Sequence, residues 1–131
     1  MSGADEEFSD ERTIVGDRLQ FIAAERVVKR PEQAYIIVIA GPNVGEMYKI
    51  GRGGDIGRGS DAAFRLTDTE ISRRHATLVV REDTVVLQDL GSTNGTLVNG
   101  VAVKIQKLND GDKIQVGTTT ILKFSYHDDL E

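Results

Sequence analysis

The sequence predicts an all-β domain of the sandwich class, and three observations support this prediction. Short runs rich in β-branched and aromatic residues recur throughout residues 34–126, and turn-forming residues separate them. Asn99-Gly100 stands between two such runs and favours the type I′ turn of a tight β-hairpin. No segment with helical periodicity lies among these runs, so a parallel α/β sheet is not expected.

The strands are expected in the following order along the chain. The first is the β-branched run Tyr35–Ile39, which Gly41-Pro42-Asn43 would end. Glu82-Asp83 is predicted to form a second tight hairpin turn, and Gly51–Gly54 a flexible loop. The remaining strands are predicted at Glu46–Ile50, Ala63–Leu66, Ala76–Arg81, Thr84–Asp89, Thr96–Val98, Val101–Ile105, Lys113–Val116 and Thr119–Tyr126.

Residues 1–33 are expected to be an acidic regulatory tail and linker. Residues 1–13 carry five carboxylates and one arginine without hydrophobic periodicity, so they are predicted to be disordered. Residues 17–30 have apolar positions at helical spacing, with Asp17 to cap a helix and Pro31 to end it. A helix of about fourteen residues is marginal alone in water, so we expect it only when packed. The alternative is a conduit from the tail to the domain or to a second copy.

Composition sets the class of protein and its compartment. The chain has 131 residues, which corresponds to one domain, and its 39% apolar content is enough for one core. It has no cysteine, which excludes disulfides and is compatible with a reducing compartment. The N-terminus has no secretion-signal pattern, and the run Tyr35–Ala40 is too short to span a membrane. We therefore expect a cytoplasmic protein that does not bind membranes.

The net charge of −5 is concentrated at the two ends of the chain. Residues 1–13 carry −4 and residues 127–131 carry −3, whereas residues 34–126 hold ten acidic and eleven basic side chains. A nearly neutral domain does not repel an anionic ligand strongly. It also lacks the broad positive field of a nucleic-acid-binding protein, so no nucleic-acid partner is expected.

Polar residues suited to binding an anion gather in one stretch of the domain. They form three motifs, Gly57-Arg58, Ser72-Arg73-Arg74-His75 and Thr93-Asn94-Gly95. A guanidinium can donate two parallel hydrogen bonds to a phosphate, and a serine can offer its hydroxyl and its backbone N–H. No thiol or carboxylate pair accompanies them. We therefore interpret this stretch as a binding surface and not as a reaction centre.

In this order and at this spacing, the three motifs resemble those of the forkhead-associated (FHA) family. Members are eleven-stranded β-sandwiches that bind phosphothreonine peptides. The resemblance implies that Arg58 and Ser72 contact the phosphate and that Arg73 lies beside phosphate or peptide. It also implies that Thr93 and Asn94 support the site, with the Asn94 amide clamping the ligand backbone.

The resemblance covers roughly residues 34–126 and assigns structural roles to three further residues. His75 would be hydrogen-bonded beneath the loops and hold them in place. Gly57 and Gly95 would support the site, the latter by allowing a tight backbone. Arg74 is expected to be a surface charge.

Competing chemistry in the same stretch is less well supported. Ser72 and His75 lie three residues apart, but the nucleophile elbow of a hydrolase is absent. The only other histidine, His127, does not suggest a metal site. Gly57-Arg-Gly59 fits a relaxed dinucleotide fingerprint, but a strand and not a helix is predicted to follow it. We expect no catalytic activity, cofactor or metal in this chain.

Thr13 is a candidate phosphorylation site, because a flexible threonine in the same molecule is a ready ligand once a Ser/Thr kinase has acted. About twenty residues separate it from Ala34. A flexible linker of that length spans about 25 Å, so the tail could reach the binding loops. Tethering would give an effective concentration on the order of millimolar.

The regulatory context suggested by the resemblance is bacterial. Bacterial domains with this pattern, including a lead-in similar to Ile39–Gly45, often precede an output enzyme such as a diguanylate cyclase. We interpret residues 127–131 as an acidic connection to a downstream domain, through which the protein would dimerise. The alternative is a phosphorylation-independent structural or protein-interaction sandwich.

Overall fold

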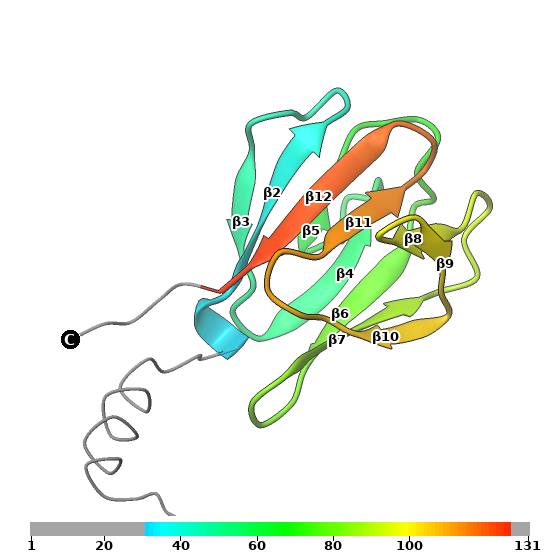
Figure 1. Ribbon diagram of the computed structural model, residues 1–131. Helices are drawn as coiled ribbons and strands as arrows, with labels where there is room; N and C mark the ends of the chain where they lie inside the picture. Colours follow the sequence, from blue (N-terminus) through cyan, green and yellow to red (C-terminus); the bar gives the residue numbers. More distant parts are fainter. Residues whose placement is uncertain (1–30, 127–131) are drawn as a thin grey trace, which may run out of the picture. The chain divides into compact units, whose positions relative to one another are not determined.

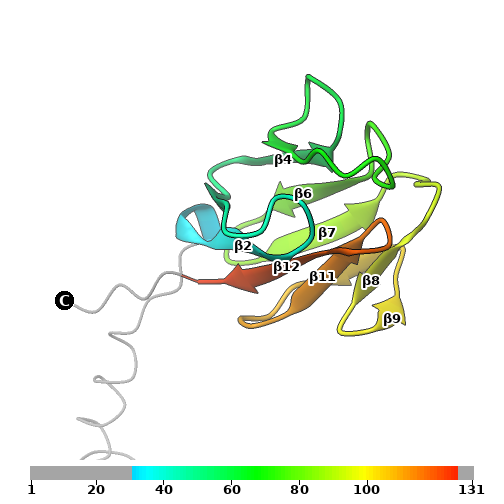
Figure 2. The ribbon, with the colours of Figure 1, turned by 90° about the horizontal axis from the view of Figure 1, so that it is seen from above.

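The computed structural model describes residues 31–126, which form two β-sheets packed face to face (Figures 1 and 2). A short 3-10 helix, η1 (Pro31–Gln33), precedes the first strand. The strands are β2 (Tyr35–Ala40), β3 (Met47–Lys49), β4 (Gly53–Gly57), β5 (Phe64–Arg65), β6 (Ala76–Val80), β7 (Val85–Asp89), β8 (Thr96–Val98), β9 (Val101–Ala102), β10 (Ile105–Lys107), β11 (Lys113–Val116) and β12 (Thr120–Ser125). The all-β class with eleven strands is confirmed for this part of the chain.

One sheet has five strands in the order β10-β7-β6-β4-β5, and the other has six in the order β3-β2-β12-β11-β8-β9. All neighbouring strands are antiparallel except β4 and β5, which pair in parallel through Ile56↔Phe64 and Gly57↔Arg65. A parallel pair cannot be joined by a two-residue turn. The chain therefore makes a wider loop after β4, and this loop carries Arg58.

The core lies between the two sheets, where alternate residues of each strand face inward. In the six-stranded sheet, Ile36, Leu122 and Phe124 are at most 1% exposed. From the five-stranded sheet, Leu78 and Leu87 meet them at similar burial. This period of two is what a half-buried strand requires, and it holds both sheets rigid under the loops.

The predicted flexible loop Gly51–Gly54 is only partly correct, because Gly53 and Gly54 belong to β4 and pair with β6. A Cβ atom at Gly53 would lie 2.3 Å from the carbonyl oxygen of Leu78. Glycine is therefore needed here for the close approach of two strands. The rule that glycine disfavours strands failed because packing overrides it.

The predicted strand Val101–Ile105 is two strands in different sheets. Val101 and Ala102 form β9, whereas Ile105 begins β10 on the other sheet. The chain crosses between the sheets at Val103 and Lys104, whose backbones bond to β8 and β7 respectively. The other predicted strands agree with the structure to within about one residue at each end.

Both predicted hairpin turns are present. Asn99 and Gly100 have φ angles of 51° and 85°, as a type I′ turn requires, and they join β8 to β9. The backbone N–H of Arg81 donates to the Thr84 carbonyl at 2.8 Å, which closes the turn at Glu82-Asp83.

The acidic tail, the helix predicted at 17–30 and the end segment 127–131 lie outside the described residues. Within residues 31–126, no helix is long and apolar enough to cross a membrane.

Candidate functional site

Three loops meet at one end of the five-stranded sheet and bring the predicted motifs together. We call them the Arg58 loop (residues 58–63), the Ser72 loop (66–75) and the Asn94 loop (90–95). The Arg58 backbone N–H donates to the Ser72 carbonyl at 3.1 Å, which joins the first two loops. The Asn94 loop bonds to the Ser72 loop through Thr93, Asn94 and Gly95, as described below, and through Leu90 N–H, which donates to the His75 carbonyl at 2.9 Å.

Arg58 is half-buried and fixed at both its backbone and its side chain. Its Nε donates to the carbonyl of Ile71 at 2.9 Å. Neither terminal Nη group has an acceptor among residues 31–126. The guanidinium therefore has a fixed position and keeps its outer donors free for a ligand.

Gly57 lets the Arg58 loop approach the Ser72 loop closely. A Cβ atom at this position would lie 2.0 Å from the carbonyl oxygen of Arg73. No side chain fits at that distance. The structure thus gives a steric reason for glycine immediately before Arg58.

Ser72 links the Ser72 loop to the Asn94 loop through its hydroxyl. Its Oγ accepts the backbone N–H of Thr93 at 3.0 Å, so its own hydroxyl hydrogen remains to be donated. The expectation that the Ser72 backbone N–H is also free for an anion is wrong. That N–H donates to Nδ1 of His75 at 3.0 Å.

His75 is fully buried and holds two loops by its two ring nitrogens. Nε2 lies 2.8 Å from the Gly95 carbonyl oxygen, which can only accept, so Nε2 carries the proton. Nδ1 then accepts from Ser72 N–H. The ring is therefore neutral in this arrangement, and it bonds to the backbone of Ser72 and not to its Oγ, so the two residues do not form a nucleophile–base pair.

The side chain of Asn94 forms a further link between the Asn94 and Ser72 loops. Its Nδ2 donates to the Glu70 carbonyl at 2.8 Å and to the Glu70 carboxylate at 3.2 Å. Because both partners are acceptors, the orientation of the amide is fixed. Only its Oδ1 then remains for a ligand, where it can accept a hydrogen bond. Gly95 follows with a φ of 84°, which turns the chain sharply.

The Asn94 loop is organised by Asp89, which the sequence reasoning missed. Asp89 accepts hydrogen bonds from the backbone N–H groups of Gly91 and Ser92 and from the hydroxyls of Ser92 and Thr96. Ser92 Oγ in turn accepts Gly95 N–H at 3.0 Å. Burial raises the pKa of Asp89, but these hydrogen bonds outweigh it and hold the pKa below its usual value. The local signal was Asp89-x-Gly91-Ser92, which is typical of an Asx turn.

A second missed carboxylate, Asp68, fixes the start of the Ser72 loop. It accepts hydrogen bonds from Glu70 N–H and from the hydroxyls of Thr119 and Thr120, which begin or precede β12. Burial raises the pKa of Asp68, but these bonds outweigh it and lower the pKa. No local pattern indicates this anchor, because the threonines lie about fifty positions further along the chain.

The charges around the site differ in how far they are neutralised. Arg74 pairs with Asp55 at 2.9 Å, which confirms its place as an exposed surface charge. Arg73 is exposed and has no ion-pair partner among residues 31–126. A depression of about 590 Å³ lies beside it, lined by Asp55, Gly59, Ser60, Asp61, Ala62, Arg73 and Arg74. The positive charges of Arg58 and Arg73 are thus not neutralised by a carboxylate among residues 31–126.

The structure bears on two alternative kinds of site. Gly57 and Gly59 are followed by a loop and by β5, and not by the helix that a dinucleotide fingerprint requires. Within residues 31–126, no group of three or more His, Asp or Glu side chains is placed to hold a metal ion.

Solved structures and curated proteins resemble this chain over its β-sandwich. A structure described as an analysis of phosphothreonine-dependent FHA domain interactions is 38% identical, with a TM-score of 0.65. The similarity covers 72% of this chain and 96% of that one. FhaA of Mycobacterium tuberculosis is 46% identical over 79 residues, which is 60% of this chain. The glycogen accumulation regulator GarA of the same organism is 35% identical over 88 residues, or 66% of this chain.

The aligned residues span only 15% of the length of FhaA and 54% of the length of GarA. Long segments of both relatives therefore have no counterpart in the aligned part of this chain. The chain also matches a model of a whole protein family. A model of the FHA domain matches residues 48–117, which include all three motifs and the loops that carry them. The chain belongs to the FHA domain family.

Proposed function

We propose that residues 34–126 bind a phosphothreonine-containing peptide and signal by binding, without catalysis. One observation carries this proposal: the Arg58 guanidinium and the Ser72 hydroxyl are fixed on adjoining loops and keep donors free. Arg58 is held through Nε to Ile71, and Ser72 through its acceptance of Thr93 N–H. Two or more charge-assisted hydrogen bonds to one phosphate are a strong arrangement. The phosphothreonine-dependent interactions of a 38% identical FHA domain support it.

The remaining site residues are proposed to contact or support the same ligand. Arg73 would add an exposed positive charge beside the phosphate, and Thr93, which is exposed on the Asn94 loop, would support the site. Asn94 Oδ1 would accept a backbone N–H of the peptide, because its Nδ2 is engaged by Glu70. Gly57, His75 and Gly95 support the loops without touching the peptide.

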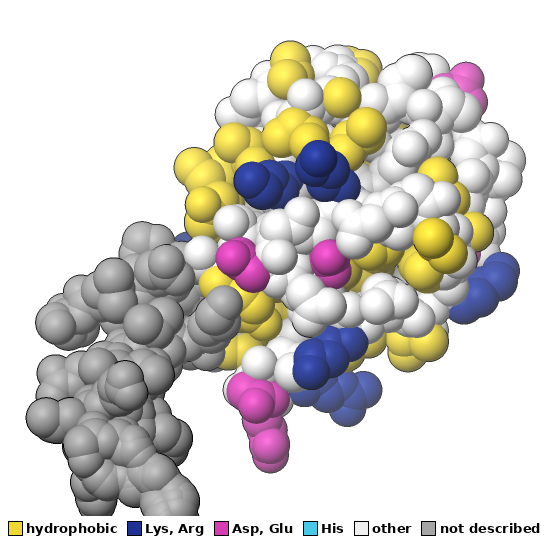
Figure 3. Space-filling view, in the orientation of Figure 1, with side chains coloured by type: hydrophobic (Ala, Val, Ile, Leu, Met, Phe, Trp, Pro, Cys, Tyr) yellow, Lys and Arg dark blue, Asp and Glu magenta, His cyan; other side chains and the backbone are white. Residues whose placement is uncertain are grey.

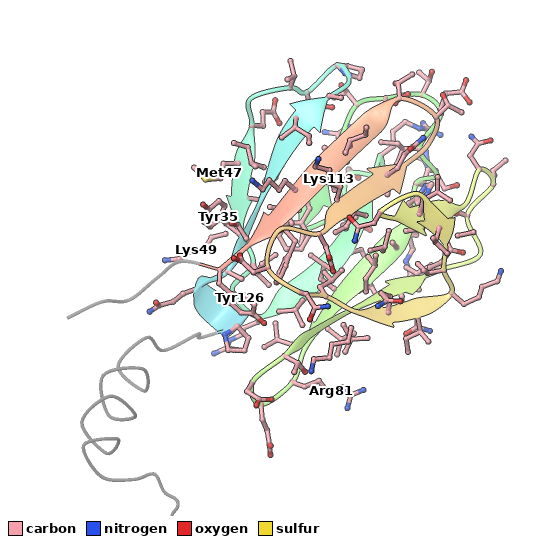
Figure 4. All side chains as sticks on the ribbon, viewed as in Figure 1. Tyr35, Met47, Lys49, Arg81, Lys113 and Tyr126 are labelled. Atoms are coloured by element: carbon pink, nitrogen blue, oxygen red, sulfur yellow. The ribbon has the colours of Figure 1, made fainter. Side chains whose placement is uncertain are left out.

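The test is a titration of the full chain with three versions of one peptide, carrying phosphothreonine, phosphoserine or unmodified threonine. Phosphothreonine is expected to bind best. Arg58→Ala should weaken it about tenfold or more, since a hydrogen bond to a charged group contributes about 1.5–3 kcal/mol. The matched control is Arg81→Ala, since Arg81 lies on the β6–β7 hairpin (Figure 4). Equal binding of the unmodified peptide would favour the phosphorylation-independent interaction domain instead.

We further propose that Thr13, which lies outside the described residues, becomes a ligand of this site after phosphorylation by a Ser/Thr kinase. The support is its position in an acidic segment within reach of the domain by linker length. Kinase treatment should lower the affinity for added phosphopeptide, because the tethered ligand competes. Thr13→Val should remove that effect. An identical response of both proteins would reject the self-ligand.

An attached or partner output enzyme such as a diguanylate cyclase is a proposal that rests only on the resemblance of the lead-in Ile39–Gly45. A dimer formed through that output domain belongs to the same proposal. A longer reading frame containing a cyclase domain is the observation that would test both.

A further inference from the structure

The outer face of the six-stranded sheet is unusual in its charge pattern. Its six strands contain no acidic residue, and their only charged side chains are Lys49, Lys113 and Lys123. All three are exposed, and none has an ion-pair partner among residues 31–126. In Figure 3, dark blue side chains lie next to yellow hydrophobic ones on the face formed by β2, β12 and β11. We call this surface the lysine face.

The strand register arranges these side chains in a row that crosses the sheet. Lys113 lies directly opposite Lys123, Lys123 opposite Ile37, and Ile37 opposite Met47. The row therefore has a basic half on β11 and β12 and an apolar half on β2 and β3. Figure 4 shows the labelled ends, with Met47, Tyr35 and Lys49 on the β3 side and Lys113 on the other.

Both halves of this row lower the stability or the solubility of an isolated molecule. Like charges directly opposite each other on neighbouring strands destabilise a sheet. Met47 is 59% exposed on an edge strand, and Ile39, which occupies a β-bulge nearby, is 40% exposed. An apolar patch on such an edge is typical of an interaction surface.

We propose that the lysine face docks a segment of a partner protein that carries carboxylates at one end and apolar side chains at the other. Neighbouring strands lie about 4.8 Å apart, so the centre of the lysine pair is about 10 Å from the Ile37–Met47 pair. The carboxylates of the partner would neutralise Lys113 and Lys123, and its apolar side chains would cover Ile37 and Met47. In an extended partner this spacing corresponds to about three residues.

The like charge of the strand lysines disfavours a second copy of the same face as the occupant. Two such faces bring together six lysines from their strands, whereas the acidic side chains on this side, magenta in Figure 3, come from outside those strands. The face also differs from the phosphate site, since Arg58 and Ser72 lie in loops attached to the five-stranded sheet. Occupation of one surface thus leaves the donors of the other unchanged.

The test uses a synthetic peptide with Glu at alternate positions i and i+2 and Leu at i+4, which share one face of an extended chain, and a matched peptide with Gln in place of Glu. Both are titrated into the isotope-labelled full chain, and amide chemical shifts are followed by NMR. The acidic peptide should shift amides of β2, β3, β11 and β12. The Gln peptide should bind roughly threefold to tenfold more weakly, as expected for the loss of two exposed ion pairs.

Variants show whether the response belongs to the lysine face. The double variant Lys113→Gln, Lys123→Gln should weaken binding of the acidic peptide by the same factor, whereas Lys107→Gln on β10 and Arg58→Ala should not. Equal binding of the two peptides, or shifts confined to the Arg58, Ser72 and Asn94 loops, would overturn the proposal. So would concentration-dependent dimerisation that buries the face, which would identify a second copy as its occupant.

Discussion

The backbone N–H of Thr93 donates to the hydroxyl oxygen of Ser72 at 3.0 Å, across 21 positions of the sequence. This bond positions one loop against another and also directs the remaining hydroxyl hydrogen. Because the oxygen already accepts, the hydrogen of Ser72 is available to an anionic ligand. One side chain thus serves both the architecture of the site and its proposed chemistry.

Ser72→Ala is therefore expected to weaken phosphopeptide binding about tenfold or more and to lower the free energy of unfolding by only about 1 kcal/mol. The variant loses a donor to the phosphate and leaves Thr93 N–H to bond with water. Isothermal titration and urea denaturation measure the two effects. Ser60→Ala, in the neighbouring Arg58 loop, is the matched control. Unchanged affinity of Ser72→Ala would remove this hydroxyl from the site.

His75→Phe is expected to lower both the free energy of unfolding and the affinity for phosphopeptide. It leaves the partly buried Ser72 N–H and Gly95 carbonyl without partners, at up to about 1–3 kcal/mol each. Leu78→Val is the control, because it weakens the core at a buried position of β6, outside the three loops. It should lose stability and keep its affinity. Equal retention of affinity by both variants would contradict a positioning role for His75.

The lowered pKa of Asp89 predicts how the free energy of unfolding changes in acid. Its pKa is lowered in the folded protein, so its contribution is present above the unfolded pKa of about 3.9 and is lost as pH falls through the lower folded value. Asp89→Asn should lower the free energy of unfolding at pH 7 by about 1–3 kcal/mol, because its amide cannot accept all four hydrogen bonds.

Urea denaturation between pH 3 and pH 7 measures this difference. The two proteins should converge toward the acidic end of that range. Asp61→Asn, a change in the exposed Arg58 loop, should follow the wild-type curve. A constant gap between Asp89→Asn and wild type at every pH would assign the effect to packing and not to the ionised carboxylate.

Gly57→Ala should destabilise the protein by about 1–3 kcal/mol or more, as overpacking does. The added methyl group would collide with the Arg73 carbonyl oxygen. Gly59→Ala is a graded control, since its Cβ would be 3.1 Å from the same oxygen. Thermal unfolding should place Gly59→Ala between wild type and Gly57→Ala. The reverse order would show that the Arg58 loop moves freely.

The sequence allowed the all-β class, most strands and both hairpin turns to be predicted, because these depend on local alternation and on turn residues such as Asn99-Gly100. It failed at Gly53-Gly54, where contact with Leu78 outweighs the low strand propensity of glycine. It also failed at Val101–Ile105, because the alternating pattern continues unchanged while the chain passes from one sheet to the other.

Some residues of the candidate site could likewise be predicted from the sequence, and others could not. The motif spacing brought Arg58, Ser72 and Asn94 to attention, and the loops do place them together. The anchors Asp68 and Asp89 did not stand out. Asp68 bonds to threonines far away in sequence, and Asp89 ends an ordinary strand. The use of Ser72 N–H by His75 depends on loop geometry that no pattern of residue types reveals.

The parallel pairing of β4 with β5 has a practical consequence for engineering. The two ends of the Arg58 loop are held together by the pairing Ile56↔Phe64 and by Leu66 N–H, which bonds to the Gly57 carbonyl. Extra residues inserted between Ser60 and Ala63 would consequently project into solvent without shifting the alignment of either strand. Libraries built at this point would vary the surface beside the anchored guanidinium, offering a route to reagents with altered peptide preference.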